Sequence, residues 1–333
     1  MTDYFLGVDV GSSKTHALIT DDKGVILGFG RGGPGNHEIV GYSGLEQALQ
    51  TSVYQALNEA GILIEQISGA GFGVSGYDWP SERNPMLKSI ASLGLNCSLE
   101  LVNDVDIGLI AGATQGWGVA IDAGTGNNVR GRSPDGQVAG ITGCGNRFGE
   151  LGGASELVGL ALIAIAHDWS RRGPQTILTE KFREHVGASS SVDFLEGVAL
   201  HRYDLSANMG LLVIQAATVG DKIAQEIVRV NSQDLGKSAL GVIRQLEFQN
   251  SRFEIVLIGS MFKSGPLIFK PMEEIILSEA PYAQFAQLSC PPAAGGVLLG
   301  MAAAGLNPQS MRTKLMGNLG SGKDQIFQPS ETA

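Results

Sequence analysis

Short apolar runs, each followed by a polar or glycine-rich turn, dominate the first thirty residues. The runs at residues 4–10 (YFLGVDV), 15–21 (THALITD) and 25–30 (VILGFG) have the length of buried strands. The sequence DKG between the last two runs is typical of a hairpin turn. The pattern therefore predicts three consecutive β-strands at the start of the chain.

The next segment changes to a helical period. Residues 43–60 place leucine or valine at every fourth position, which predicts an amphipathic helix that ends at Gly61. Residues 69–76 (GAGFGVSG) read as a glycine-rich buried strand and turn, and residues 99–104 (LELVND) as a strand with polar residues at its end.

The opening pattern then starts again. Residues 117–140 repeat the order of apolar strand, Asp-x-Gly turn, strand, hairpin turn and strand. The two Asp-x-Gly turns begin at Asp9 and Asp122, and a single repeat at this distance is too long for a solenoid, whose period is roughly 20–50 residues. The chain is thus predicted to be an α/β protein with two similarly folded halves.

The second half then becomes mainly helical. Residues 211–247 show amphipathic helical periodicity, a strand is expected at 253–260, and a small-residue helix at 291–305. From Asn307 onward the chain is polar, and we expect it to be irregular.

The bulk composition narrows the possible partners. The chain has 333 residues, enough for two domains, and a net charge of −10, which disfavours nucleic acid or an anionic membrane as the main partner. The three cysteines are far apart and indicate neither a disulfide framework nor a zinc site. With no leader and no stretch near ~20 apolar residues, a cytoplasmic protein is expected.

Two loops offer phosphate-binding chemistry. VDVGSSKT (8–15) and IDAGTGNN (121–128) each follow an apolar strand and combine backbone N–H groups with hydroxyl side chains in a tight turn. One glycine turn alone is weak evidence, because ordinary hairpins also need glycine. Two such loops, each opening a matching pair of strands, favour binding of a chain of phosphates.

Seven motifs stand in order along the chain: VDVGSSKT (8–15), PGNHEIVG (34–41), GVSGYD (73–78), VNDVDIG (102–108), IDAGTGNN (121–128), ITGCGNRFGELGG (141–153) and VLIGSMFKSG (256–265). Together they make the chain resemble the sugar kinase, heat-shock ATPase and actin superfamily. Within it, the chain looks most like the BadF/BadG/BcrA/BcrD-type ATPases, which include N-acetylglucosamine and glucosamine kinases. The resemblance runs from about residue 4 to about residue 305.

The resemblance implies a fold and an activity. The fold would be two actin-like (ribonuclease H-like) domains with a cleft between them, at 1–116 and at 117–305 with a helical insert, followed by a polar tail at 306–333. The activity would be ATP- and Mg²⁺-dependent phosphorylation of a sugar hydroxyl, with an amino sugar such as N-acetylglucosamine or glucosamine as substrate. A homodimer is compatible with this reading.

The resemblance also assigns roles to residues. Asp104 would be the general base, although its position before a helical stretch also fits a helix N-cap. Asp9 would orient Mg²⁺, directly or through water. Two roles stay open. Lys14 would either contact a phosphate or be a solvated surface side chain, and Ala217 would either contact the nucleoside or pack within its helix. The ATP-binding set is Asp9, Gly11, Ser12, Ser13, Lys14, Thr15, Gly124, Thr125, Gly126, Ala217, Gly259 and Ser260.

A second set would contact the acceptor sugar. It comprises Asn36, Ser75, Gly76, Asn103, Asp104, Gly143, Cys144, Gly145 and Glu150. The chain departs from the family here. It reads Gly-Glu-Leu-Gly-Gly at 149–153 where the family usually has Gly-Asp-Glu-Gly-Ser, and Cys144 stands where an aromatic residue is common. The identity of the sugar is therefore left open.

Two other functions compete with the kinase. One is an ATPase that activates a dehydratase or reductase, but such activators hold an iron–sulfur cluster with paired cysteines, and Cys144 has no second cysteine near it in sequence. The other is a sugar-binding homologue without catalysis. Residues 317–324 (GNLGSGKD) nearly match a P-loop but lack its final Ser or Thr, and we interpret them as part of a flexible tail.

Overall fold

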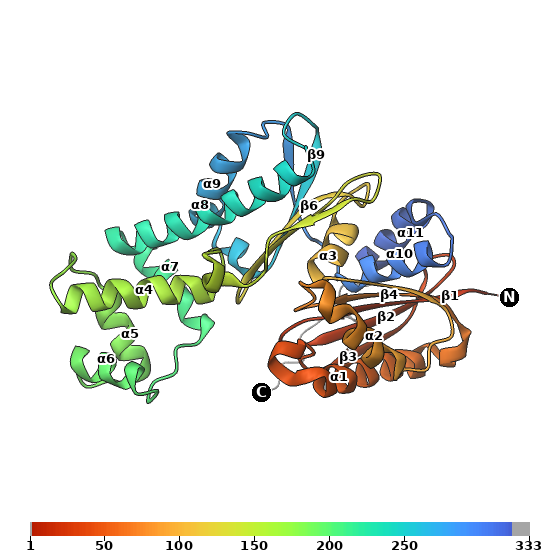
Figure 1. Ribbon diagram of the computed structural model, residues 1–333, viewed down its shortest axis with the longest axis horizontal. Helices are drawn as coiled ribbons and strands as arrows, with labels where there is room; N and C mark the ends of the chain where they lie inside the picture. Colours follow the sequence, from red (N-terminus) through yellow and green to blue (C-terminus); the bar gives the residue numbers. More distant parts are fainter. Residues whose placement is uncertain (1, 322–333) are drawn as a thin grey trace.

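The computed structural model describes residues 2–321 and contains two five-stranded sheets (Figure 1). The first sheet has the strand order β3-β2-β1-β4-β5 and the second the order β10-β9-β6-β7-β8. The strands are β1 (Tyr4–Val10), β2 (Thr15–Asp21), β3 (Ile26–Gly32), β4 (Ile67–Val74), β5 (Ser98–Val102), β6 (Gly118–Ala123), β7 (Asn127–Arg132), β8 (Val138–Gly140), β9 (Phe253–Ile258) and β10 (Ala283–Gln287).

The two sheets share one topology, which confirms the repeat seen in the sequence. In each, three consecutive strands pair antiparallel, and the first of them pairs in parallel with a later strand. The central strands are β1 and β6. Asp9 and Asp122 lie near the C-terminal ends of these two strands, so the repeat places them in matching positions.

The described part of the chain contains eleven helices. They are α1 (His37–Ala60), α2 (Arg83–Ala91), α3 (Asp104–Gly112), α4 (Ala154–Trp169), α5 (Leu178–Val186), α6 (Ser191–Ala199), α7 (Gly210–Thr218), α8 (Lys222–Gln245), α9 (Pro266–Leu277), α10 (Ala293–Ala303) and α11 (Pro308–Ser321). None of the helices described is both long and apolar enough to cross a membrane.

Helix α1 begins earlier than the sequence predicted. Its first residues precede a kink at Gly41, which has φ +68°, and Asn36 caps its N-terminus by accepting from the Glu38 N–H. Beyond the kink, Leu45, Leu49 and Val53 pack against the first sheet as predicted. The cap of α1 is thus formed by a residue of the predicted acceptor set.

Helix α3 lies between the two sheets and joins the halves of the molecule (Figure 1). Val105, Leu109 and Ala113 pack with Ala120 of β6 and Val256 of β9 in a small buried cluster. The same helix also contacts α10 and β4 of the first half. Its position therefore depends on both halves.

The last two helices return to the first half of the molecule. Helix α10 contacts β1 and β4, and α11 packs beside it, with Leu315 and Leu319 fully buried against residues that include Phe5 (Figure 1). The expectation of an irregular tail is therefore wrong for residues 308–321, because apolar contacts with the first half support a helix. The near-P-loop segment contributes its residues 317–321 to α11, and the remainder lies outside the described residues. Where the chain divides into domains stays a prediction.

Gly295 allows α10 to approach α3, and its replacement is expected to destabilise the fold. A Cβ at this position would lie 1.9 Å from the Ile107 carbonyl oxygen. We expect Gly295→Ala to lower the free energy of unfolding by about 1–3 kcal/mol, the usual cost of overpacking. Gly241 of α8 has open space around it, so Gly241→Ala should instead stabilise by about 0.4–1 kcal/mol. Urea unfolding of both variants tests the contrast, and equal effects would contradict it.

Candidate active site

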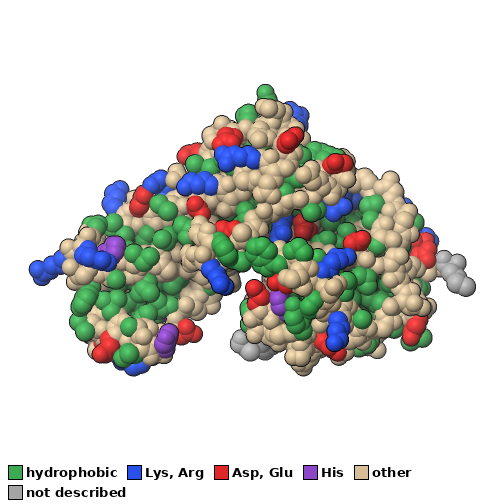
Figure 2. Space-filling view, in the orientation of Figure 1, with side chains coloured by type: hydrophobic (Ala, Val, Ile, Leu, Met, Phe, Trp, Pro, Cys, Tyr) green, Lys and Arg blue, Asp and Glu red, His purple; other side chains and the backbone are tan. Residues whose placement is uncertain are grey.

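A polar cavity of about 450 Å³ lies between the two halves, where the molecule is hollowed between its lobes (Figure 2). Both predicted phosphate loops face it. Its walls are formed by Gly11, Ser12, Ser13, Lys14, Asn36, Glu38, Ser75, Gly76, Asp78, Asp104, Val105, Asp122, Gly124, Thr125, Gly126, Asn127, Asn128 and Gly143. Twelve residues of the two predicted sets therefore share one cavity.

The first loop is tied to the predicted acceptor wall. The Gly11 N–H donates to the Lys14 carbonyl over 2.9 Å and closes the turn after β1. The Asn36 amide donates to the Ser12 and Ser75 hydroxyls at 3.2 and 3.4 Å. These bonds hold a phosphate-loop side chain, the cap of α1 and the end of β4 in one network.

The second loop is held at the beginning of α4. The Gly124 N–H donates to the Gly126 carbonyl over 2.9 Å, and the Ala154 and Ser155 N–H groups donate to the Gly124 and Thr125 carbonyls at 3.0 and 2.9 Å. Because helix N-termini carry a partial positive charge, this arrangement favours an anion at the loop.

Asn103, and not Asp104, caps the helix that carries the predicted base. The Asn103 side chain accepts from the Val105 N–H over 3.0 Å, while its amide donates to the Tyr77 carbonyl at 3.3 Å. Asn103 is 2% exposed and does not line the cavity, so its expected contact with the sugar is not seen. The first residue of α3 is Asp104, which lines the cavity. Asn103 therefore fills the capping role that the sequence had left open for Asp104.

Several carboxylates share this part of the molecule. Burial raises the pKa of Asp104 well above its usual range, and the Asp122, Asp9 and Asp78 carboxylates raise it further. Burial also raises the pKa of Asp9 to about 7, against the opposing effect of Lys14, and that of Asp122 to about 6.

The carboxylates of Asp9 and Asp122 fit a hard divalent cation. Each is disfavoured as an anion where it stands, and a Mg²⁺ ion would relieve that cost. Among the described residues, no group of three acidic, histidine or cysteine side chains has metal-binding geometry. Magnesium often binds proteins through one or two carboxylates, with water and phosphate as its other ligands. Of the two aspartates, Asp122 lines the cavity and Asp9 does not.

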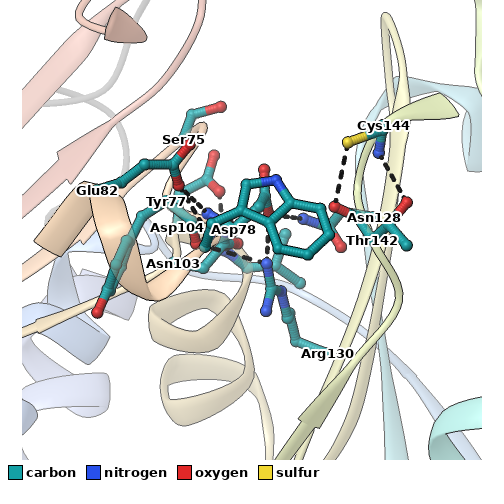
Figure 3. A network of polar contacts seen from close by, with 12 residues as sticks. Ser75, Tyr77, Asp78, Glu82, Asn103, Asp104, Asn128, Arg130, Thr142 and Cys144 are labelled. Atoms are coloured by element: carbon teal, nitrogen blue, oxygen red, sulfur yellow. Dashed lines mark hydrogen bonds and ion pairs between the residues drawn. The ribbon is translucent and has the colours of Figure 1, made fainter. Parts of the chain in front are cut away.

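Asp78 links the two halves beside Asp104 (Figure 3). One of its carboxylate oxygens accepts from the Arg130 guanidinium, and also from the Asn103 and Asn128 amides at 3.3 Å each. Asp78 follows β4, whereas Arg130 and Asn128 belong to β7. The network therefore crosses the cleft.

A second, less polar cavity of about 310 Å³ adjoins the first, since Gly124 and Thr125 line both. Its other walls come from the start of α4, from α7 and the 3-10 turn before it, and from the 3-10 turn at Ser260–Ser264. It is suited to a nucleoside. The predicted Ala217 does not reach it, because that side chain is buried in the core of the second half; Leu211 and Ile214 of the same helix line it instead.

Other predicted residues lie behind the cavity walls. Thr15 is fully buried and donates to the Gly33 carbonyl over 2.9 Å. Glu150 accepts from the Thr142 N–H and hydroxyl at 2.8 and 2.9 Å and from the Cys144 N–H at 3.1 Å, so its carboxylate holds the predicted sugar loop together. Cys144 and Gly145 stand in that loop and, of its residues, only Gly143 lines the cavity.

Gly259 is required by a close approach between strands. It has φ +100°, and a Cβ there would lie 2.2 Å from the Ala123 carbonyl oxygen and 2.9 Å from an Asp122 carboxylate oxygen. It lines neither cavity, whereas Ser260 lines the second. Gly259 thus lets the end of β9 lie against the second loop.

Sequence reasoning missed five polar residues of the first cavity: Glu38, Asp78, Asp122, Asn127 and Asn128. Asp122 had a signal, because the repeat matches it to Asp9, and the two asparagines continue the second loop motif. Asp78 is the last residue of the motif GVSGYD, but only its ion pair with Arg130 of β7 explains why an acidic residue lies there.

Comparison with known proteins agrees with this architecture. Residues 6–300 match the model of the BadF/BadG/BcrA/BcrD ATPase family. An N-acetylmuramic acid/N-acetylglucosamine kinase of Clostridium acetobutylicum is 25% identical over 301 residues, covering 89% of this chain and 97% of that protein.

Solved structures show the same fold. A protein from Chromobacterium violaceum, solved as a candidate N-acetylglucosamine kinase, aligns with a TM-score of 0.65 and 21% identity over 89% of this chain and 98% of that one. A ROK family glucokinase from Streptomyces griseus, in complex with glucose and AMPPNP, aligns with a TM-score of 0.54 and 19% identity over 92% and 98%. The expected fold of two actin-like halves is confirmed.

Proposed function

The chain belongs to the BadF/BadG/BcrA/BcrD ATPase family, and we propose that it is an ATP-dependent kinase of a sugar hydroxyl, with an amino sugar as acceptor. One observation carries this proposal. Both glycine loops and Asp104 face a single cavity, which adjoins a second cavity suited to a nucleoside. A triphosphate that runs from the second cavity into the first ends beside the base.

The chemistry then needs mainly positioning and charge stabilisation. Asp104 accepts the proton of the acceptor hydroxyl, and the oxygen of that hydroxyl forms a bond to the γ-phosphorus of ATP. The bond between the γ-phosphorus and the oxygen that bridges it to the β-phosphorus breaks, and ADP leaves. Lys14 and the N–H groups of the two loops contact the phosphates. Asp9 and Asp122 would hold Mg²⁺, which neutralises phosphate charge when bound.

The acceptor side of the cavity supports a hydroxyl-rich ligand. Asn36 and Ser75 present an amide and a hydroxyl there, and Gly143 lines the same cavity. Because an unmatched buried polar group is costly, such walls discriminate well between hydroxyl patterns. The choice of an amino sugar rests on the name of the Clostridium acetobutylicum relative.

An acceptor panel tests the proposal. ADP release from ATP and Mg²⁺ is measured by a coupled assay with N-acetylglucosamine, glucosamine, N-acetylmuramic acid and glucose. We expect at least one amino sugar to exceed glucose in kcat/KM by about 10-fold or more, since the polar walls select by hydroxyl and amide pattern. The phosphorylated product is identified by ³¹P NMR. If ATP binds but no sugar raises ADP release above the rate without acceptor, the proposed function is wrong.

A further inference from the structure

Helix α11 reaches the place where the chain crosses between its two halves. Residues 113–117 lead from α3 to β6, and residues 288–292 lead from β10 back to α10. A cavity of about 480 Å³ is lined by both crossings and by α11. Its α11 wall includes Gln309 and Arg312. In a two-lobed protein, these crossings are where a hinge motion is absorbed.

Arg312 is bound to the C-terminal end of α3. It is only 8% exposed, and its guanidinium donates to the Ala111 carbonyl over 3.2 Å and to the Ile110 carbonyl. Nearby, the Gln309 amide donates to the Thr114 carbonyl over 2.9 Å. Two side chains of α11 therefore hold the last carbonyls of α3 and the crossing that follows.

The positive charge of Arg312 is balanced by the C-terminal end of helix α3. Within residues 2–321, no carboxylate forms an ion pair with Arg312. Glu254 lies near, but its oxygens accept from the Thr114 N–H and hydroxyl at 2.6 and 2.9 Å. The C-terminus of a helix carries a partial negative charge, which favours a cation there. Burial of a lone guanidinium is costly, so its bonds to α3 must compensate.

The opposite end of α3 carries the base. The helix is nine residues long, begins at Asp104 and ends at Gly112, so that a shift at its C-terminus moves the carboxylate at its N-terminus. We propose that Arg312 is a positioning residue, which places the Asp104 carboxylate by fixing the far end of α3 across the hinge. This role rests on the proposed kinase function. The arginine acts through the helix and touches neither ATP nor acceptor.

Kinetics of variants test the role. We expect Arg312→Met to lower kcat about 10-fold, because Asp104 is misplaced in the transition state, with KM values for ATP and acceptor within about twofold. Arg312→Lys should recover part of kcat, since a cation remains. Ethylguanidinium at millimolar concentration should raise kcat of Arg312→Ala, because the adjoining cavity gives it access.

A matched control lies on the same helix. Asn318 donates to the Gly24 carbonyl over 2.7 Å at the other end of α11, away from α3. Asn318→Ala removes a side-chain bond to a backbone carbonyl, as the Arg312 variants do, and should leave kcat within about twofold. An equal loss of kcat in Asn318→Ala and Arg312→Met would mean that α11 only stabilises the fold, and the proposed role would be overturned.

Hydrogen exchange separates this inference from the proposed function. In Arg312→Met, amides of residues 104–112 should exchange at least about 5-fold faster than in the wild type, whereas Asn318→Ala should leave them unchanged. This readout needs no substrate, so it stands even if no sugar is phosphorylated. Unchanged exchange in α3 together with unchanged kcat would refute the role of Arg312.

Discussion

Asp104→Asn is expected to lower kcat by about 10²–10⁴-fold, the usual contribution of a positioned general base. The amide keeps the shape of the side chain but accepts no proton, so KM for ATP should change less than about threefold. The acceptor-dependent ADP assay measures both parameters. The residue lines the cavity as the first residue of α3, while its neighbour Asn103 serves as the cap.

The same substitution should not destabilise the protein. Burial and three neighbouring carboxylates raise the pKa of Asp104 above its unfolded value, so its ionised form opposes folding at neutral pH. Removal of that charge should leave the melting temperature unchanged or higher, as is common where activity demands a strained site. An inactive variant that also melts lower would point to a structural role instead.

Asp106 offers a matched control in the same helical turn. Burial raises its pKa to about 6, but it does not line the cavity. Asp106→Asn should therefore keep kcat within about threefold of the wild type. If both variants lose activity to the same degree, the loss belongs to the N-terminus of α3 and not to a base at Asp104.

Local patterns predicted the framework of the site well. The apolar runs, the helical period after Gly41 and the repeat of Asp9 at Asp122 are all short-range signals, and the strands and loops lie where they indicated. What chain-local reasoning could not decide was the direction of a side chain. Asn103 and Asp104 are both suited to a cap, and only the packed structure shows which one faces the cavity.

Features that depend on distant contacts were missed or wrongly predicted. Helix α11 has weak periodicity of its own, and burial of Leu315 and Leu319 against the first half stabilises it. The expected contact of Glu150 with the sugar stays a prediction; its carboxylate accepts from Thr142, eight residues earlier, and so holds the sugar loop together. Ala217 lies on the predicted helix, yet its face points to the core.

The ion pair between Asp78 and Arg130 links the two walls of the cleft. Its side chains are 9% and 15% exposed, so solvent screens the pair little. Burial raises the pKa of Asp78, and the charge and hydrogen bonds of Arg130 oppose that rise. Without the guanidinium, the Asn103 and Asn128 amides would face a buried carboxylate with no cation beside it.

Arg130→Met is therefore expected to lower the free energy of unfolding by about 3–5 kcal/mol at pH 7, the usual result of breaking a buried pair from one side. Methionine keeps much of the volume, so the loss reports the charge. Urea unfolding measures it. Further substitution of Asp78 by asparagine should recover much of the stability, because the uncompensated carboxylate is then removed.

The pH dependence of the free energy of unfolding tests independently whether the Asp78 carboxylate causes the loss of stability in Arg130→Met. In Arg130→Met the folded-state pKa of Asp78 lies further above its unfolded value, so the folded state binds the extra proton and stability rises as pH falls through that pKa. The difference in free energy of unfolding between the variant and the wild type should therefore become smaller as the pH falls from 7 to 5.5. Arg202→Met, which breaks surface ion pairs with Asp193 and Glu196, should lower the free energy of unfolding by no more than about 1 kcal/mol, and this difference from the wild type should not change between pH 7 and pH 5.5. A difference that stays constant with pH in Arg130→Met would exclude Asp78 as the source of the loss.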